Sequence, residues 1–446
     1  MRKLLITNAR VINESEICDA DILIKGERID KIAGSITPDA DVQILDANGK
    51  YLIPGMIDDQ VHFREPGLTN IADIATESAA AVAGGITSFM DMPNVNPQTT
   101  SRKALAEKYK LAEHRCSANY AFYLGATNHN IEEIKSLQIN EACGIKAFMG
   151  ASTGNMLIDD PEALEQLFAQ APILVATHCE HSPTIFDNEA HARTKYGDQV
   201  PMFEHPNIRS ASACLMSSSF AVDLAHRHDA RLHVLHLTTA IEMDLFSKAD
   251  RGEKRITGEV CVHHLWFDES RYQDLGARIK CNPAIKKATD RSALITALNE
   301  GRMDIIATDH APHLIEDKKK SYFKVPAGMP LVQHALLTLF ELARDGQISL
   351  ELLVDKTSHA VADIYGVVDR GYIREGYFAD LVLIDNKAPY TVNSSNLLYK
   401  CHWSPFEGET FSSTIDTTIV NGHIIYQNGK LYGDIVGQRL QFKRGR

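Results

Sequence analysis

The segment PILVATH (172–178) is a short apolar run that ends in a histidine, and LHVLHL (232–237) is a similar run with a histidine next to its end. Further runs of the same kind are YLIPGMI (51–57), ITSFMDM (86–92), YAFYLGA (120–126), GIKAFM (144–149), ITGEVCVHHL (256–265) and MDIIATD (303–309). Amphipathic stretches such as Ile71–Gly84 and Ser292–Glu300 lie between them and are expected to be helices. Strand-like runs that alternate with helices are typical of repeated βα units. The sequence therefore predicts an α/β fold with a (β/α)8 TIM-type barrel over residues 54–370.

Both ends of the chain have a different texture, in which short apolar runs alternate with turn residues. The N-terminal examples are LLITNARVIN (4–13) and DILIKGERIDKIAG (21–34), and ADLVLID (379–385) is C-terminal. Asn421-Gly422 is a strong signal for a hairpin turn. We expect short antiparallel strands from residues 1–53 and 371–446 to close into one small composite β-sandwich domain.

Composition and charge exclude several classes of function. The chain has 446 residues, of which 46 are Lys or Arg and 58 are Asp or Glu, for a formal net charge of −12. An acidic chain without a basic stripe argues against nucleic acid as a partner. The basic run at residues 318–320 is predicted to be a solvated loop. No apolar stretch approaches the roughly 18 residues that a membrane span needs, so no membrane partner is expected.

The eight cysteines are scattered along the chain with no CxxC pair. This pattern indicates neither a zinc ribbon nor a disulfide framework. The apolar stretch that follows Met1-Arg2-Lys3 is too short for a signal peptide. We therefore expect reduced thiols and a cytoplasmic protein.

Chemically reactive side chains close several of the apolar runs. In a barrel of this type the active site lies at the C-terminal ends of the strands, so these residues should meet at one rim. They are His62, with Gln60 and Arg64 on either side of it, His178, His236 and Asp309, while Lys146 stands inside the run 144–149. Imidazoles, a carboxylate and a lysine at one rim match the ligands that a zinc-type cation takes.

Each of these residues also has a structural explanation. A histidine after a strand can be a hydrogen-bonded structural residue, and Asp309 could cap a helix. Lys146 is harder to explain in this way, because buried lysines are rare unless they are paired or modified. Their coincidence on different strands of one barrel favours the metal site.

PGMIDDQVHFREPG (54–67) resembles the first-strand signature of dihydroorotases and related cyclic amidohydrolases, which has the form PGxIDxHxHxRxPG. Other segments resemble further motifs of this family: DMPN (91–94), HCEH (178–181), KCNP (280–283), TDHAPH (308–313), EGYFADLVLID (375–385) and SPFEG (404–408). The resemblance therefore covers essentially the whole chain.

The resemblance implies a role for each residue of the rim. His62 would bind a first metal ion, His178 and His236 a second, and Lys146, carbamylated by carbon dioxide, would bridge the two. Asp309 would bind the first ion and act as proton shuttle. Arg64 and Asn94 would hold the substrate's carboxylate, with Asn282 and His313 supporting the ring. The implied activity is the zinc-dependent, reversible hydrolysis of dihydroorotate to N-carbamoyl-aspartate in pyrimidine synthesis, by a homodimer.

The chemistry of the reaction agrees with these roles. A bound cation polarises an amide carbonyl and lowers the pKa of water, and a carboxylate at the rim can carry the proton to the departing nitrogen. The guanidinium of Arg64 suits a ring that bears a carboxylate, which hydantoin and dihydropyrimidine lack. Arg64 therefore favours dihydroorotate over these substrates.

Gln60 departs from the family pattern, in which the first histidine stands at this position. A carboxamide is a weaker ligand than imidazole, so we expect one firmly bound zinc ion and a second that is facultative. Two alternatives stay open. The chain could be an inactive scaffold partner of aspartate transcarbamoylase, or an enzyme that acts on allantoin, hydantoin or dihydropyrimidine. Ala151–Met156 is expected to form a flap beside the site.

Overall fold

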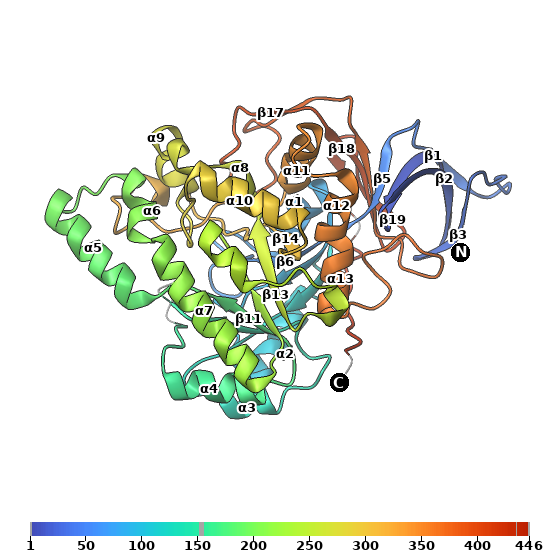
Figure 1. Cartoon of the computed structure of the whole chain (residues 1–446). Coiled ribbons are helices and arrows are strands. Elements are labelled where there is room, and N and C mark those ends of the chain that lie inside the picture. The colour runs from blue at the N-terminus through green and yellow to red at the C-terminus, as the bar shows by residue number, and fades with distance from the viewer. Residues whose placement is uncertain (1, 151–155, 434, 445–446) are drawn as a thin grey trace.

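The computed structural model describes residues 2–150, 156–433 and 435–444 (Figure 1). Parallel strands form a barrel at its centre: β6 (Met56–Val61), β7 (Ile86–Asp91), β8 (Asn119–Phe122), β9 (Leu124–Gly125), β10 (Ile145–Phe148), β11 (Val175–His178), β12 (Leu232–Val234), β13 (Ile256–Cys261) and β14 (Ile305–Ala307). A parallel bridge between Val61 and His310 closes the ring, and the His62 N–H donates to the His310 carbonyl at 2.8 Å. The predicted barrel is confirmed.

Helices follow the barrel strands and cover the outside of the barrel (Figure 1). The longer ones are α1 (Ile74–Ala83), α2 (Arg102–Ala112), α4 (Pro161–Gln170), α5 (Ser182–Tyr196), α7 (Ala211–His228), α10 (Ala288–Asn299) and α11 (Ala335–Arg344). The shorter ones are α3 (Ile131–Lys135), α6 (His205–Ile208), α8 (Val262–Trp266), α9 (Tyr272–Leu275), α12 (Leu350–Val354) and α13 (Ala360–Tyr365). The predicted helix at 71–84 begins only at Ile74, because the Asp73 side chain accepts the N–H of Thr76 and caps it.

The two ends of the chain meet in one nine-stranded sheet, in which the blue N-terminal and red C-terminal strands lie side by side (Figure 1). Its strands are β1 (Lys3–Asn13), β2 (Glu16–Lys25), β3 (Arg28–Ala33), β4 (Gln43–Asp46), β5 (Tyr51–Pro54), β15 (Leu381–Asp385), β18 (Thr414–Val420), β19 (His423–Gln427) and β20 (Lys430–Leu431). The expected hairpin at Asn421-Gly422 joins β18 to β19, and both residues have positive φ. The expectation of purely antiparallel pairing was wrong, because β4 and β5 both run parallel to β1.

The first predicted barrel run, residues 51–57, is divided between the two parts of the fold. Tyr51–Pro54 form β5 in the terminal sheet, and the barrel strand β6 starts at Met56. The chain changes sheets at Gly55, where a Cβ atom would lie 2.1 Å from Thr87 Oγ1. Only glycine fits this close approach. The domain limits at residues 53 and 370 stay a prediction.

Two expectations for loops have different outcomes. The predicted solvation of residues 318–320 is wrong for Lys318, which is buried and donates to the carbonyls of Pro326 and Gly328 at 2.9 and 2.8 Å. The expected flap at 151–156 lies, except for its last residue, outside the described residues.

Within the described part of the chain, no helix has both the length and the apolar character that crossing a bilayer requires.

Candidate active site

A cavity at the C-terminal ends of the barrel strands collects nearly all the candidate residues. Gln60, His62, Arg64, Asn94, Lys146, His178, His236, Asn282 and Asp309 line it. Phe148, Ala311, Ala327 and Gly328 complete the wall. The remaining candidate, His313, lies directly behind the cavity, with its Nε2 3.1 Å from the Arg64 guanidinium.

Two histidines on neighbouring strands aim ring nitrogens at each other. His178 Nδ1, at the end of β11, lies 3.0 Å from Nε2 of His236, just beyond β12. Burial lowers the pKa of both side chains, so both rings are neutral at pH 7. The other nitrogen of His178 lies 3.1 Å from Oε2 of Glu180, a carboxylate that also pairs with Arg209. A carboxylate in this position can orient the imidazole so that its other nitrogen is available to a cation.

A buried carboxylate, that of Glu259, accepts a hydrogen bond from the backbone of His236. His236 has φ +41°, and its backbone N–H donates to Oε1 of Glu259 at 2.9 Å. Glu259 belongs to a fully buried cluster in which His233 Nε2 lies 3.4 Å from Asp59 and 3.7 Å from Glu259. Although burial acts to lower it, Asp59 and Glu259 raise the pKa of His233 to about 9. Glu259 therefore supports a left-handed backbone conformation that a histidine rarely adopts.

Lys146 is the second residue of β10, lines the cavity and is only 1% exposed. Among the described residues its amine forms no hydrogen bond or ion pair, although it lies 4.7 Å from the centre of the Phe148 ring. Burial lowers the pKa of Lys146 to about 8, against the opposing effect of Asp309 and Glu259. A larger share of the amine is therefore neutral than in an exposed lysine, and the neutral amine is the form that reacts with carbon dioxide.

Asp309 stands opposite Lys146. Two side chains point at it, one from β6 and one from the residue that follows β6. His62 Nε2 lies 3.1 Å from Asp309 Oδ1, and Gln60 Nε2 donates to the same oxygen at 3.2 Å. The other nitrogen of His62 is 2.8 Å from Oδ1 of Asn94. Although burial acts to raise it, His62 brings the net pKa of Asp309 below its usual value, so the carboxylate stays ionised. The Gln60 carbonyl oxygen points away, 3.8 Å from Cys261 Sγ.

Arg64 supplies the positive charge on the remaining side of the cavity. It is 4% exposed, and its Nε donates to the Pro312 carbonyl at 3.2 Å. No carboxylate forms an ion pair with it among the described residues, and burial lowers its pKa only to about 10, so it remains charged. Asn282 Oδ1 is also buried without a hydrogen-bond partner there. These groups can accommodate an anionic, polar ligand.

Sequence reasoning missed several polar residues around this cavity. Glu180 stands inside the HCEH segment, whose resemblance to a family motif assigns this residue no role. Glu259 and Asp59 left no signal, because a single acidic residue inside an apolar run says nothing about its partners. His263 and His264, which close the predicted run 256–265 and could touch the site on sequence grounds, lie on α8 and form with Cys261 a further group of possible metal ligands beside Gln60.

Comparisons with known proteins agree with this geometry. The profile of the amidohydrolase family matches residues 51–425. A dihydroorotase of Methanosphaera stadtmanae is 29% identical, with 97% of this chain and 98% of the relative covered. A dihydroorotase of Pediococcus pentosaceus is 30% identical, covering 95% and 99%. Among solved structures, the L-hydantoinase (dihydropyrimidinase) of Arthrobacter aurescens superposes with a TM-score of 0.93 at 25% identity, over 99% of this chain and 100% of the other.

Proposed function

Since the chain belongs to the amidohydrolase family, we propose that it is a dihydroorotase, which reversibly hydrolyses the cyclic amide of dihydroorotate to N-carbamoyl-aspartate in pyrimidine synthesis. One observation carries the proposal within this family. The buried guanidinium of Arg64, which pairs with no carboxylate among the residues that the structure describes, lines the same cavity as the neutral pair His178 and His236. The cavity thus offers a place for a cation beside a place for the substrate's carboxylate.

The donor set fits a zinc ion. Neutral nitrogens of His178 and His236 aim at one point, and the pKa of Lys146 favours the neutral amine that becomes a carbamate ligand. When bound there, zinc polarises the amide carbonyl and lowers the pKa of water. His62 and Asp309 would hold a second ion less firmly, because Gln60 turns its amide nitrogen rather than its oxygen toward Asp309.

The remaining roles follow from charge and position. The ionised Asp309 accepts the proton of the attacking water and passes it to the ring nitrogen that leaves. Arg64 and Asn94 hold the substrate's carboxylate, while Asn282 and His313 orient the ring. Asn94 also accepts a hydrogen bond from His62, which aims the opposite nitrogen of that ring at Asp309.

A comparison of substrates tests the proposal. The zinc-loaded protein is assayed by loss of ultraviolet absorbance with dihydroorotate, hydantoin, dihydrouracil and allantoin. We expect turnover of dihydroorotate and little turnover of the others, because only dihydroorotate carries the carboxylate that Arg64 can bind. A preference for hydantoin or dihydrouracil would instead assign the function of the hydantoinase neighbour.

The alternative of an inactive scaffold makes a different prediction. Such a protein would be silent on all four substrates although folded and metal-loaded, and would bind an aspartate transcarbamoylase. Against it stands the number of reactive groups retained at the rim, where Gln60 is the single departure from the family pattern. We further propose that the enzyme is cytoplasmic, in keeping with eight free cysteines, seven of them buried. We also propose a homodimer, on the family resemblance alone. Its mass in solution, by light scattering, tests the dimer.

Metal content is expected to depend on Gln60 and Lys146. The purified protein should hold about one zinc ion per chain by elemental analysis, and Gln60→His should raise this toward about two by adding an imidazole beside His62. Lys146→Gln should lose most of the zinc. Native mass spectrometry of the wild type should show the added mass of one carbon dioxide, which the Lys146 variant lacks.

Cys261→Ala provides the matched control, because Cys261 belongs to the neighbouring group with His263 and His264. Zinc should be retained in this variant. Loss of zinc from Cys261→Ala together with retention in Lys146→Gln would place the ion in the neighbouring group and contradict the proposed site.

A further inference from the structure

A second and larger cavity lies at the opposite end of the barrel from the active site. Its volume is about 610 Å³. Residues that precede the strands line it, including Leu174 before β11, Arg231 before β12 and Arg255 before β13. The C-terminal tail contributes Lys443 and Arg444. Because His178 ends β11 and His236 lies just beyond the end of β12, this cavity is separate from the catalytic rim.

The cavity concentrates positive charge in a chain whose net charge is −12. Three of its cations have carboxylate partners: Arg251 pairs with Asp355 and Asp363, Lys254 with Asp304, and Arg255 with Asp229. The other three, Arg231, Lys443 and Arg444, form no ion pair among the described residues. In the part of the chain that the structure describes, these three side chains thus have no carboxylate within ion-pair distance, and the six Lys and Arg of the lining outnumber its three carboxylates, Asp229, Glu253 and Asp363.

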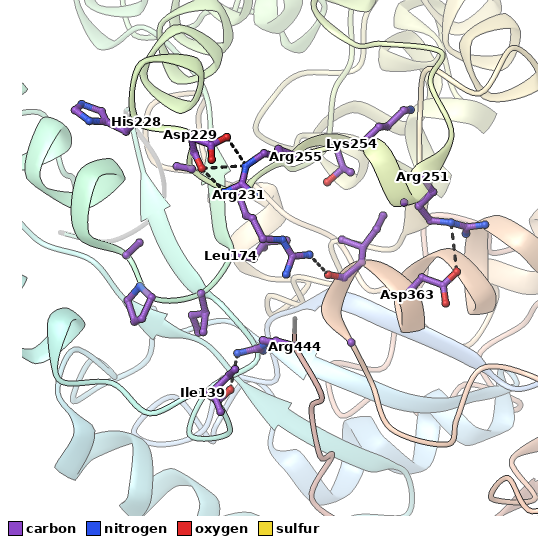
Figure 2. Close-up of a pocket in the computed structure, with 18 of the residues that line it drawn as sticks. Ile139, Leu174, His228, Asp229, Arg231, Arg251, Lys254, Arg255, Asp363 and Arg444 are labelled. Carbon is purple, nitrogen blue, oxygen red and sulfur yellow. Dashed lines mark hydrogen bonds and ion pairs between the residues drawn. The ribbon is translucent and has the colours of Figure 1, made fainter. Parts of the chain in front are cut away.

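The unneutralised arginines face other cations. Figure 2 shows Arg231 between Arg255 and Arg444, with its guanidinium donating to the carbonyl of Ile364. Arg444 likewise donates to backbone carbonyls, among them that of Ile139 at 2.7 Å. Burial and the charge of Arg231 lower the pKa of Arg444 to about 10. Carbonyl oxygens fix the two guanidinium groups in place but carry no net charge to offset their repulsion.

One wall of the cavity is apolar. It is formed by Phe168 of α4 and by the segment that leads into β11, namely Pro172, Ile173 and Leu174. Cavities of about 300–1,000 Å³ with an apolar wall and a few convergent charged groups are typical of sites for small organic molecules. A bare inorganic anion would leave the apolar wall without a contact.

We propose that this cavity binds a phosphorylated small organic molecule, whose phosphate lies between Arg231 and Arg444 and whose organic part rests on the wall formed by Phe168, Ile173 and Leu174. Guanidinium groups bind phosphate oxygens with charge assistance. Arg231 uses one N–H on the Ile364 carbonyl and can offer the others, whereas Arg444 gives four of its five N–H groups to the carbonyls of Tyr365, Ile139, Ala142 and Cys143 and adds mainly its charge. Lys443 adds a third positive charge at the exposed mouth of the site. The ligand would tie the C-terminal tail to the starts of three barrel strands.

Calorimetric titration of the zinc-loaded protein tests this proposal with three probes: AMP, inorganic phosphate and adenosine. AMP should bind, inorganic phosphate should bind more weakly because it lacks the organic part, and adenosine should not bind. AMP should also raise the melting temperature, since a ligand of the native state stabilises it by mass action. No binding of AMP would overturn the proposal, and equal binding of AMP and phosphate would overturn the role of the apolar wall.

Variants locate the site. Lys443→Glu reverses an exposed charge that makes no side-chain interaction among the described residues, so it should leave folding and activity unchanged and weaken AMP binding about tenfold or more. Arg231→Gln should have a larger effect. Arg439→Gln is the matched control, because this tail arginine also donates to a backbone carbonyl, that of Asn140, but lies outside the cavity. Unchanged affinity in Lys443→Glu and Arg231→Gln, or an equal loss in the control, would overturn the assignment.

Discussion

Asp309→Asn is expected to lower kcat for dihydroorotate by about 10²–10⁴-fold, the usual contribution of a positioned general acid–base group. The substitution keeps the shape of the side chain and removes its charge. Gln60 and His62 both direct nitrogens at the Asp309 oxygen, so the amide that replaces it can still be held in place. An amide cannot accept the proton of the attacking water, and the loss should therefore appear in kcat rather than in KM.

The measurement is the initial rate of ultraviolet loss with saturating dihydroorotate, with zinc content and circular dichroism recorded on the same sample. Asp317→Asn is the matched control, because Asp317 is a partly exposed carboxylate paired with Lys320 away from the cavity. The control should retain full activity. If Asp309→Asn retained most of its kcat with normal zinc content, another group would have to transfer the proton, and our assignment would be wrong.

Arg64→Gln is expected to reverse the substrate preference. Removing one member of a buried charge pair costs several kcal/mol, which corresponds to a loss of about 10²–10³-fold in kcat/KM for dihydroorotate. Hydantoin and dihydrouracil have no carboxylate for Arg64, so their kcat/KM should be unchanged or should rise. The ratio of kcat/KM for dihydroorotate to kcat/KM for dihydrouracil separates the loss of the carboxylate contact from any general damage to the cavity.

Arg64 also has a structural role, because it has φ +66° and its Nε donates to the Pro312 carbonyl, so the substitution can alter the shape of the cavity. Glutamine keeps a donor that can reach a carbonyl, and dihydrouracil serves as the internal control. Equal losses with dihydroorotate and dihydrouracil would mean that Arg64 supports the loop at Pro312 and His313 rather than binding a carboxylate.

Local sequence patterns predicted the barrel and most of its rim. A strand alternates its side chains with a period of two and ends at a definite edge of the sheet, so a histidine that closes an apolar run can be placed at the rim without knowing the fold in detail. This rule predicts His178 and His236 at the rim, and their Nδ1 and Nε2 atoms lie 3.0 Å apart across neighbouring strands. The Asn421-Gly422 hairpin was equally local, because positive φ at both residues is a property of the dipeptide.

Predictions failed where distant segments decide the environment. Residues 51–57 looked like one apolar run, but the fit of Gly55 against Thr87 divides them between two sheets. Lys318 was predicted to be solvated because it stands in a basic run. It is instead buried, because the chain folds back at residues 326–328 and the carbonyls of Pro326 and Gly328 accept hydrogen bonds from its amine. Neither contact leaves a signal in the neighbouring sequence.

The sequence by itself determined the kind of fold, the family and the residue types that meet at the rim, because strand periodicity and motif spacing are properties of short segments. Only the tertiary structure decided how those residues are held. It turned the Gln60 amide nitrogen toward Asp309, placed Glu180 behind His178 and Glu259 beneath His236, and gathered Arg231, Lys443 and Arg444 around one cavity. These arrangements join residues that are mostly far apart in the chain, and burial and hydrogen bonding between such residues arise only once the barrel has closed.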